Sequence, residues 1–177
     1  MKLDLLLAIF ESKGLLSETV TYKRGEWIEK EGVISNTIYF IESGSLKIYL
    51  QNKDTEQIIR FGYKNDLVVA LDSFLSDQKS DFNIQAIKLT KVRQIQKSAF
   101  FELIKSEEKY LKIWIGILEN LVQQQMEREK DLLVESPLER YNRVLSRSPR
   151  LFQEIPHKYI ANYLRMTPET LSRLKKS

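Results

Sequence analysis

The chain of 177 residues contains no cysteine and a single histidine, His157. The absence of cysteine excludes disulfides, thiolate nucleophiles, zinc fingers and cysteine-bound iron–sulfur clusters. With one histidine, the chain has no histidine-rich metal site and no haem held by two of its own histidines, and a Ser-His-Asp triad would have to use His157. We therefore predict no metal, no cofactor and no enzymatic activity.

Long apolar runs are also missing, since none approaches the roughly 18–20 residues that a membrane span needs. The first ten residues hold a short apolar patch, but Asp4 interrupts it and Glu11 follows it. We favour an amphipathic helix over residues 3–13 rather than a signal peptide, because no small-residue cleavage site appears. Its apolar face would hold Leu3, Leu6, Leu7 and Phe10. We expect a cytoplasmic protein without a membrane partner.

Proline is absent from residues 1–136, and the net positive charge of the chain is concentrated in residues 137–177. All four prolines and nine of the 28 Lys/Arg lie in residues 137–177, beside only three of the 24 Asp/Glu. That stretch therefore carries a net charge of +6, and residues 1–136 carry −2, within a total of +4. A near-neutral body with a basic end predicts two parts, the second facing a polyanion.

Residues 19–96 have the pattern of many short strands. Runs rich in β-formers are separated by turn signals such as Arg24-Gly25, Glu31-Gly32 and Ser43-Gly44. Their spacing of roughly 8–12 residues predicts an antiparallel β-roll of the jelly-roll or cupin-like type. The predicted strands are Thr19–Tyr22, Trp27–Glu29, Ile38–Glu42, Ser45–Leu50, Gln57–Phe61, Leu67–Leu71, Phe82–Ala86 and Lys91–Gln96.

From Ser98 onwards, the apolar residues recur with the period of an α-helix. A short helix precedes a long one that we expect to run to Leu133, about 36 Å for 24 residues. A helix packed on its own β-roll would explain this pattern, but so long an apolar stripe favours pairing with a second copy. The predicted dimer interface consists of Tyr110, Ile113, Trp114, Ile117, Leu121 and Gln124.

Two further helices are predicted from an N-cap residue that is followed by proline. Ser136 can cap a helix that has Pro137 at its first position, and Thr167 can cap one that begins with Pro168. A preceding helix opens at Pro156, so the last twenty residues predict two short helices joined by a tight turn, a helix-turn-helix. A small helical bundle with a solvated charged face is the alternative, and the local charge of +6 favours DNA binding.

The outer face of the last helix carries side chains suited to DNA. Arg173 can donate to guanine O6 and N7, and Glu169 can accept from cytosine N4. Threonine hydroxyls and lysine suit phosphates. The candidate DNA-contacting residues are Thr167, Glu169, Thr170, Arg173 and Lys176.

The segment Ile160–Leu174 resembles the helix-turn-helix of the Crp/Fnr family of bacterial transcription regulators. The glycine pattern of the predicted β-roll, including Ile38–Lys47, is similar too, and the order of parts matches over nearly the whole chain. The resemblance implies an α+β fold in three parts: a cyclic-nucleotide-binding-like β-roll at 1–97, helices including a dimerisation helix at 98–135, and a DNA-binding domain at 136–177.

The resemblance assigns base contacts to Glu169 and Arg173 and a phosphate contact to Thr170. Pro168 stands where the catabolite activator has a base-contacting Arg, so we expect that contact to be missing. Arg165 stands where the turn usually has Gly, so it must accept a left-handed or strained backbone. A β-hairpin wing follows the recognition helix in the family, and because this sequence ends at Ser177 we expect its phosphate contacts to be missing.

The implied effector pocket differs from that of cyclic-AMP-binding members. The ribose-binding Gly-Glu pair is replaced by Val69-Ala70, and the phosphate-binding Arg-Ser pair by Ser80-Asp81. Losing the Arg and gaining a carboxylate disfavours an anion. On the long helix the base-facing positions are Gln125 and Met126. We predict that the protein does not bind cyclic AMP in the family manner.

The leading hypothesis is a homodimeric, sequence-specific transcription regulator. Its partners would be double-stranded DNA and a second copy, with RNA polymerase and an unidentified small-molecule effector as further candidates. The alternative is a ligand-binding or protein-interaction module of the same fold with a degenerate DNA-binding end. A metal-dependent cupin enzyme is disfavoured because residues 1–136 contain no histidine.

Overall fold

The computed structural model describes residues 2–175 and the side chains of residues 5–175. Its α+β architecture, with an antiparallel β-roll, confirms the predicted fold class. The strands are β1 (Val20–Tyr22), β2 (Trp27–Glu29), β3 (Thr37–Ser43), β4 (Ser45–Asn52), β5 (Thr55–Tyr63), β6 (Leu67–Val68), β7 (Phe82–Ala86) and β8 (Thr90–Gln96). The helices are α1 (Lys2–Ser12), α2 (Leu71–Ser76), α3 (Lys97–Ser106), α4 (Glu108–Leu133), α5 (Pro137–Arg147), α6 (Pro149–Glu154), α7 (His157–Tyr163) and α8 (Pro168–Leu174).

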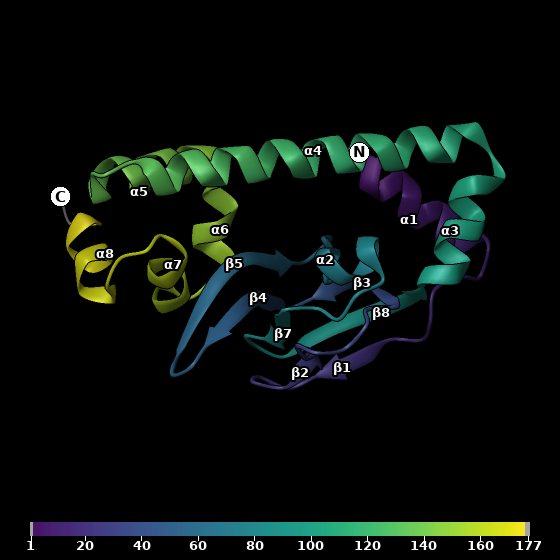
Figure 1. The fold of residues 1–177 in the computed structure, drawn as a ribbon, viewed down its shortest axis with the longest axis horizontal. Helices are drawn as coiled ribbons and strands as arrows, with labels where there is room; N and C mark the ends of the chain where they lie inside the picture. Colours follow the sequence, from purple (N-terminus) through teal and green to yellow (C-terminus); the bar gives the residue numbers. More distant parts are fainter. Residues whose placement is uncertain (1, 176–177) are drawn as a thin grey trace. The chain divides into compact units, whose positions relative to one another are not determined.

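The chain divides into two compact units, Met1–Glu119 and Asn120–Ser177. The boundary falls inside α4, which Figure 1 shows as a single long helix. Unit 1 therefore contains the β-roll, α1 to α3 and the first turns of α4. Unit 2 contains the rest of α4 and the four helices that follow it.

Two four-stranded antiparallel sheets form the β-roll of unit 1, in the orders β1-β8-β3-β6 and β2-β7-β4-β5 (Figure 1). Strands β3 and β4 belong to different sheets and meet at Gly44, which has a φ of +93°. A side chain at Gly44 would collide with the backbone of Leu89 and Thr90, so only glycine fits there. The core between the sheets consists of Tyr39, Ile41, Leu46, Ile48, Val68, Ala70, Ile84 and Val92.

A second core in unit 1 joins the helices to the roll. Phe100 of α3 lies at its centre, with ring centroids 5.8 Å from Phe10 of α1 and 4.9 Å from Trp114 of α4. Leu6 and Phe10 are buried here, as expected for the apolar face of α1. Leu3, predicted for the same face, lies outside the residues whose side chains are described.

The sequence missed two six-residue helices. The predicted strand Leu67–Leu71 is shortened to β6 because α2 starts at Leu71 and buries Phe74 against Phe100, at a centroid distance of 6.0 Å. Pro149 follows the end of α5 and occupies the first turn of α6, which buries Leu151. Helices this short depend on tertiary packing more than on local propensity, so their sequence signal is weak.

None of the helices within residues 2–175 combines the length and the apolar character that crossing a membrane requires.

Candidate nucleic-acid interface and effector site

Helices α7 and α8 pack on each other around a small apolar core. Ile160, Ala161, Leu164 and Leu171 are all buried. The Thr167 hydroxyl accepts the N–H of Thr170 at 3.2 Å, with Pro168 in the first turn, which confirms the predicted helix cap. The Ser136 cap of α5 is confirmed in the same way, by its hydrogen bond from the Glu139 N–H.

The turn between the two helices is backbone-strained at Arg165. Its φ is +54°, a left-handed conformation that non-glycine residues adopt at a cost, as expected from the sequence. The turn is closed by two backbone hydrogen bonds of 3.0 Å, from the Arg165 N–H to Asn162 and from the Met166 N–H to Ala161. The tight turn therefore forms without a glycine, the residue that would adopt this left-handed conformation at little cost.

The exposed face of α8 presents a carboxylate and a guanidinium one helical turn apart. Glu169 and Arg173 are exposed, and Thr170 between them is half-buried. Hydrogen bonding to its own backbone and to Thr167, together with the charge of Arg173, lowers the pKa of Glu169. Glu169 is therefore ionised at neutral pH and is an acceptor only. Lys176, predicted for a phosphate contact, lies outside the described residues.

Several arginines of the basic end are engaged inside unit 2. Arg143 Nε lies 3.2 Å from the carboxylate of Asp131, and Arg147 forms a second ion pair with the same group. Asp131 is 0% exposed, and its hydrogen bond raises the pKa of Arg147. Arg140 donates to backbone carbonyls of Val134 and Leu164, each at 2.7 Å. The charge of +6 thus overstates the positive charge left for a polyanion.

In unit 1, a carboxylate of the same chain occupies the hydrogen-bond donors at Ser80-Asp81. Ser80 is 2% exposed, and its hydroxyl donates to both carboxylate oxygens of Asp72, at 3.0 and 3.1 Å. The N–H of Asp81 donates to the same carboxylate at 2.9 Å. Of the other predicted pocket residues in unit 1, Ala70 is buried in the core and Val69 is half-buried.

A second carboxylate, that of Glu29, reinforces the negative character of this region. Glu29 is 9% exposed and accepts the Ser35 hydroxyl at 3.1 Å. Burial raises the pKa of Glu29, the charge of Asp72 raises it further, and hydrogen bonds from Ser35 and Tyr39 oppose the shift. Burial and the charge of Glu29 also raise the pKa of the Tyr39 phenol. An anion would meet two carboxylates here.

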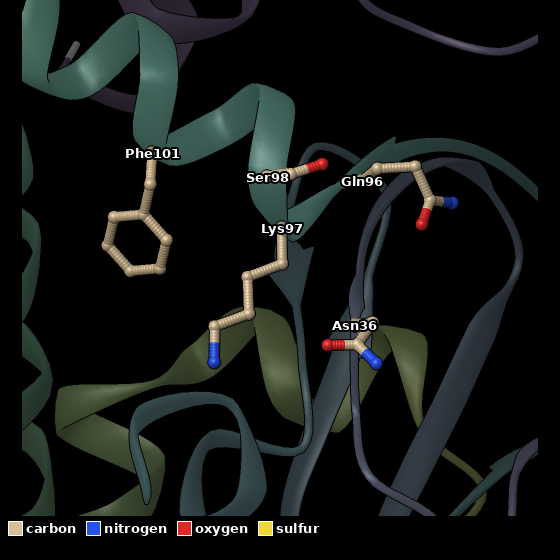
Figure 2. Close-up of a pocket in the computed structure, with 5 residues that line it drawn as sticks. All are labelled: Asn36, Gln96, Lys97, Ser98 and Phe101. Atoms are coloured by element: carbon tan, nitrogen blue, oxygen red, sulfur yellow. The ribbon is translucent and has the colours of Figure 1, made fainter. Parts of the chain in front are cut away.

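A pocket of about 330 Å³ lies elsewhere in unit 1, at the start of α3 (Figure 2). In the view of Figure 2, the Lys97 side chain lies between the ring of Phe101 and the side chain of Asn36. The Lys97 ammonium is paired with Asp77 at 2.5 Å, so it is not an isolated positive charge. None of the predicted effector residues is among the five that line this pocket, which are Asn36, Gln96, Lys97, Ser98 and Phe101.

The predicted dimer residues lie mainly on the inner side of α4. Tyr110 and Trp114 are both 6% exposed and belong to the second core of unit 1, so within one chain they pack against the β-roll helices. Ile113 and Ile117 pack against the same core, Leu121 is half-buried and Gln124 is exposed. The exposed apolar side chains of α4 are instead Leu111, Ile115, Val122, Met126, Leu132 and Leu133. Gln125, the other predicted base-facing residue, is exposed.

The structure adds residues that sequence reasoning missed. Asp72 and Glu29 in unit 1, and Arg128 and Asp131 in unit 2, are charged side chains that find their partners through the fold. Among the side chains of residues 5–175, no group of three or more His, Cys, Asp or Glu could hold a metal ion. The only local signal of these residues was a charged side chain inside a predicted strand or helix, which many surface residues share.

The chain belongs to the cyclic nucleotide-binding domain family, whose model matches residues 19–107. This match covers the β-roll and α3. Comparison with the curated proteins gives no match.

Solved structures share the fold over most of the chain. FixK2 from Bradyrhizobium japonicum has a TM-score of 0.76 at 21% identity, covering 89% of this chain and 82% of its own. A CooA variant from Carboxydothermus hydrogenoformans has a TM-score of 0.74 at 15% identity, covering 97% and 82%. A transcriptional regulator of the Crp/Fnr family from Eubacterium rectale has a TM-score of 0.69 at 18% identity, covering 93% and 78%.

Proposed function

We propose that this protein is a transcription regulator of the Crp/Fnr type that binds double-stranded DNA as a homodimer. The observation that carries the proposal is α8, whose exposed face offers the ionised Glu169 and Arg173 at the end of a capped two-helix element. In a major groove, Arg173 would donate to guanine and Glu169 would accept from cytosine. Thr167, Thr170 and Lys176 would contact phosphates.

The comparisons support a regulator rather than an enzyme. The Eubacterium rectale protein, described as a transcriptional regulator of the Crp/Fnr family, shares the fold over 93% of this chain. The proposed parts are a sensor domain at 1–97, linking helices at 98–135 and a DNA-binding domain at 136–177. RNA polymerase is the further proposed partner, and the DNA partner implies a cytoplasmic location.

The proposed dimer uses the exposed apolar side of α4. Leu111, Ile115, Val122 and Met126 follow one another at spacings of four, seven and four residues, which places them on one face of the helix. A second copy of the same stripe would bury these side chains in a two-helix seam. We expect Val122→Glu to convert a dimer into a monomer in sedimentation experiments, and Asn120→Glu, on the opposite side of α4, to leave it dimeric. A monomeric wild type would contradict this part of the proposal.

The proposed regulator does not use cyclic AMP in the manner of the family. The donors at Ser80 and Asp81 are already bound to Asp72, and the carboxylate of Glu29, which is buried, lies nearby. A cyclic phosphate would have to displace one negative charge and approach another. Any effector of this region would therefore be uncharged or cationic.

A protein-interaction module is the second candidate, favoured by the internal use of Arg140, Arg143 and Arg147. With these side chains bound inside unit 2, the electrostatic attraction for DNA is smaller than the sequence suggests. A DNA titration separates the two candidates, because the module would show no preference for any DNA sequence.

The test is a fluorescence titration of selected and random DNA with wild type and Arg173→Ala. The variant should lose about 1–3 kcal/mol on the selected site and far less on random DNA, because a base contact carries sequence information. Lys112→Ala removes an exposed cation of unit 1 that pairs with Glu108, and it should change neither affinity. Equal losses on both DNAs would contradict the assignment of Arg173.

A further inference from the structure

The turn between α7 and α8 is held from outside by arginines of two other helices. The three consecutive carbonyls of Tyr163, Leu164 and Arg165 all accept hydrogen bonds from guanidinium groups. The donors are Arg128 of α4 and Arg140 of α5. All of these residues belong to unit 2, so the contacts lie within one compact part of the chain.

Arg128 is placed at a cost that its own bonds do not recover. It is 5% exposed, its Nη2 donates to the Tyr163 carbonyl, and its guanidinium lies 3.7 Å from the centre of the Tyr163 ring. Its Nη1 is buried and has no hydrogen-bond partner among the residues described. Burial lowers the pKa of this group, with the charge of Arg165 acting in the same direction. A buried cation with an unsatisfied N–H is a poor source of stability.

Arg140 bridges the two ends of the same region. Its Nη1 donates to the Leu164 carbonyl at 2.7 Å and lies 3.4 Å from the Arg165 carbonyl. Its Nε and Nη2 donate to the Val134 carbonyl just after α4, at 3.2 and 2.7 Å. One planar side chain therefore ties the end of α4 to the turn before α8.

The turn that these two arginines contact is also the turn with the strained backbone at Arg165. A left-handed residue without glycine persists only where its surroundings determine its conformation. Arg165 has that conformation, and the arginine contacts surround it on the carbonyl side. Fixing the backbone of the turn fixes the direction in which α8 leaves it.

We propose that Arg128 and Arg140 are positioning residues, which lock the turn at 163–165 onto the end of α4 and thereby set the orientation of α8. This inference rests on the proposed function only for its consequence, that sequence-specific DNA binding depends on two arginines that do not touch the DNA. It makes the C-terminal half of α4 and α8 one rigid body.

The first experiment needs no DNA. Amide hydrogen exchange of the full chain is measured for wild type, Arg128→Met, Arg140→Met and the matched control Arg143→Met, which removes an arginine paired with Asp131 but not bonded to the turn. The Arg165 and Met166 amides should exchange about tenfold faster in the first two variants, relative to α5 amides such as that of Val144. Equal acceleration of turn and α5 amides, or of all three variants, would overturn the proposal.

The second experiment measures DNA binding as a function of salt. Arg128→Met should lower the ratio of specific to random-DNA affinity about tenfold with an unchanged salt slope, because no phosphate contact is lost. Arg128→Lys keeps the positive charge and a hydrogen-bond donor, so it should recover part of this ratio. It replaces Arg128→Met in the experiment if the methionine variant does not fold. A reduced salt slope would make Arg128 a phosphate contact and overturn the positioning role. If wild type binds no DNA while the exchange result holds, the proposed function fails and the positioning role of Arg128 and Arg140 stands.

Discussion

The carboxylates of Glu29 and Asp72 in unit 1 and of Asp131 in unit 2 are stabilised in different ways. In unit 1, the buried carboxylate of Glu29 and the half-buried carboxylate of Asp72 accept hydrogen bonds from hydroxyl and backbone N–H groups. In unit 2, the buried carboxylate of Asp131 is neutralised by two arginines, and a third arginine, Arg128, is buried against a ring and a carbonyl. The first arrangement disfavours the binding of an anion, and the second neutralises part of the positive charge of unit 2. Net charge counted along the sequence therefore does not give the local charge that a ligand meets in either unit.

The largest effect should come from the ion pairs of unit 2. Asp131→Ala leaves Arg143 and Arg147 facing a site without its carboxylate, and we expect a loss of about 3 kcal/mol in the free energy of unfolding. Urea unfolding measures it, with Glu129→Ala on the exposed side of α4 as the control. A loss no greater than that of the control would show that the buried carboxylate is not a structural centre of unit 2.

A smaller loss should follow from removing the internal anion of unit 1. Asp72→Ala removes the carboxylate that accepts hydrogen bonds from the buried Ser80 hydroxyl and the Asp81 N–H. We therefore expect the free energy of unfolding in urea to fall by about 2 kcal/mol. Asp81→Ala removes an exposed carboxylate from the same loop and should change stability by less than about 0.5 kcal/mol. Similar values for both variants would contradict the assignment of Asp72 as the group that fills these donors.

The smallest effect should be the pH dependence due to Glu29. Burial raises its pKa in the folded state above the ordinary value of 4.5, so the folded state binds its proton more readily than the unfolded state. Its contribution to stability is complete below pH 4.5 and is lost as the pH rises through the raised pKa. Glu29→Gln should therefore flatten the decline in stability above pH 4.5, whereas Glu18→Gln, at an exposed position, should not. An unchanged pH profile in Glu29→Gln would contradict the raised pKa.

Features set by neighbouring residues could be predicted from the sequence. The caps at Ser136 and Thr167 are confirmed because a cap involves only the next three residues. The predicted end of α4 at Leu133 is also confirmed. The left-handed backbone of Arg165 is confirmed too, but it was expected from the family resemblance and not from the neighbouring residues. The candidate DNA-contacting side chains of α8 remain a prediction.

Features set by distant residues could not be predicted. Both sides of α4 carry apolar residues, and the sequence does not show that Phe100 packs against Trp114 in a core that also contains Tyr110. The sequence alone therefore could not tell which apolar side of α4 is covered within one chain. The pairing of Asp131 with Arg143 and Arg147 spans 12 and 16 residues and depends on α4 and α5 packing side by side. Asp72 reaches Ser80 through α2, a helix that the sequence did not reveal.

Selection of bound DNA from a random pool tests the central claim most directly, with the purified full chain and with and without cyclic AMP. We predict enrichment of an approximately palindromic site with half-sites about one helical turn apart, and the same site with and without the nucleotide. Glu169→Ala and Arg173→Ala should each relax the enriched sequence. Failure to enrich any sequence, or enrichment only in the presence of cyclic AMP, would contradict a regulator whose α8 reads DNA without that ligand.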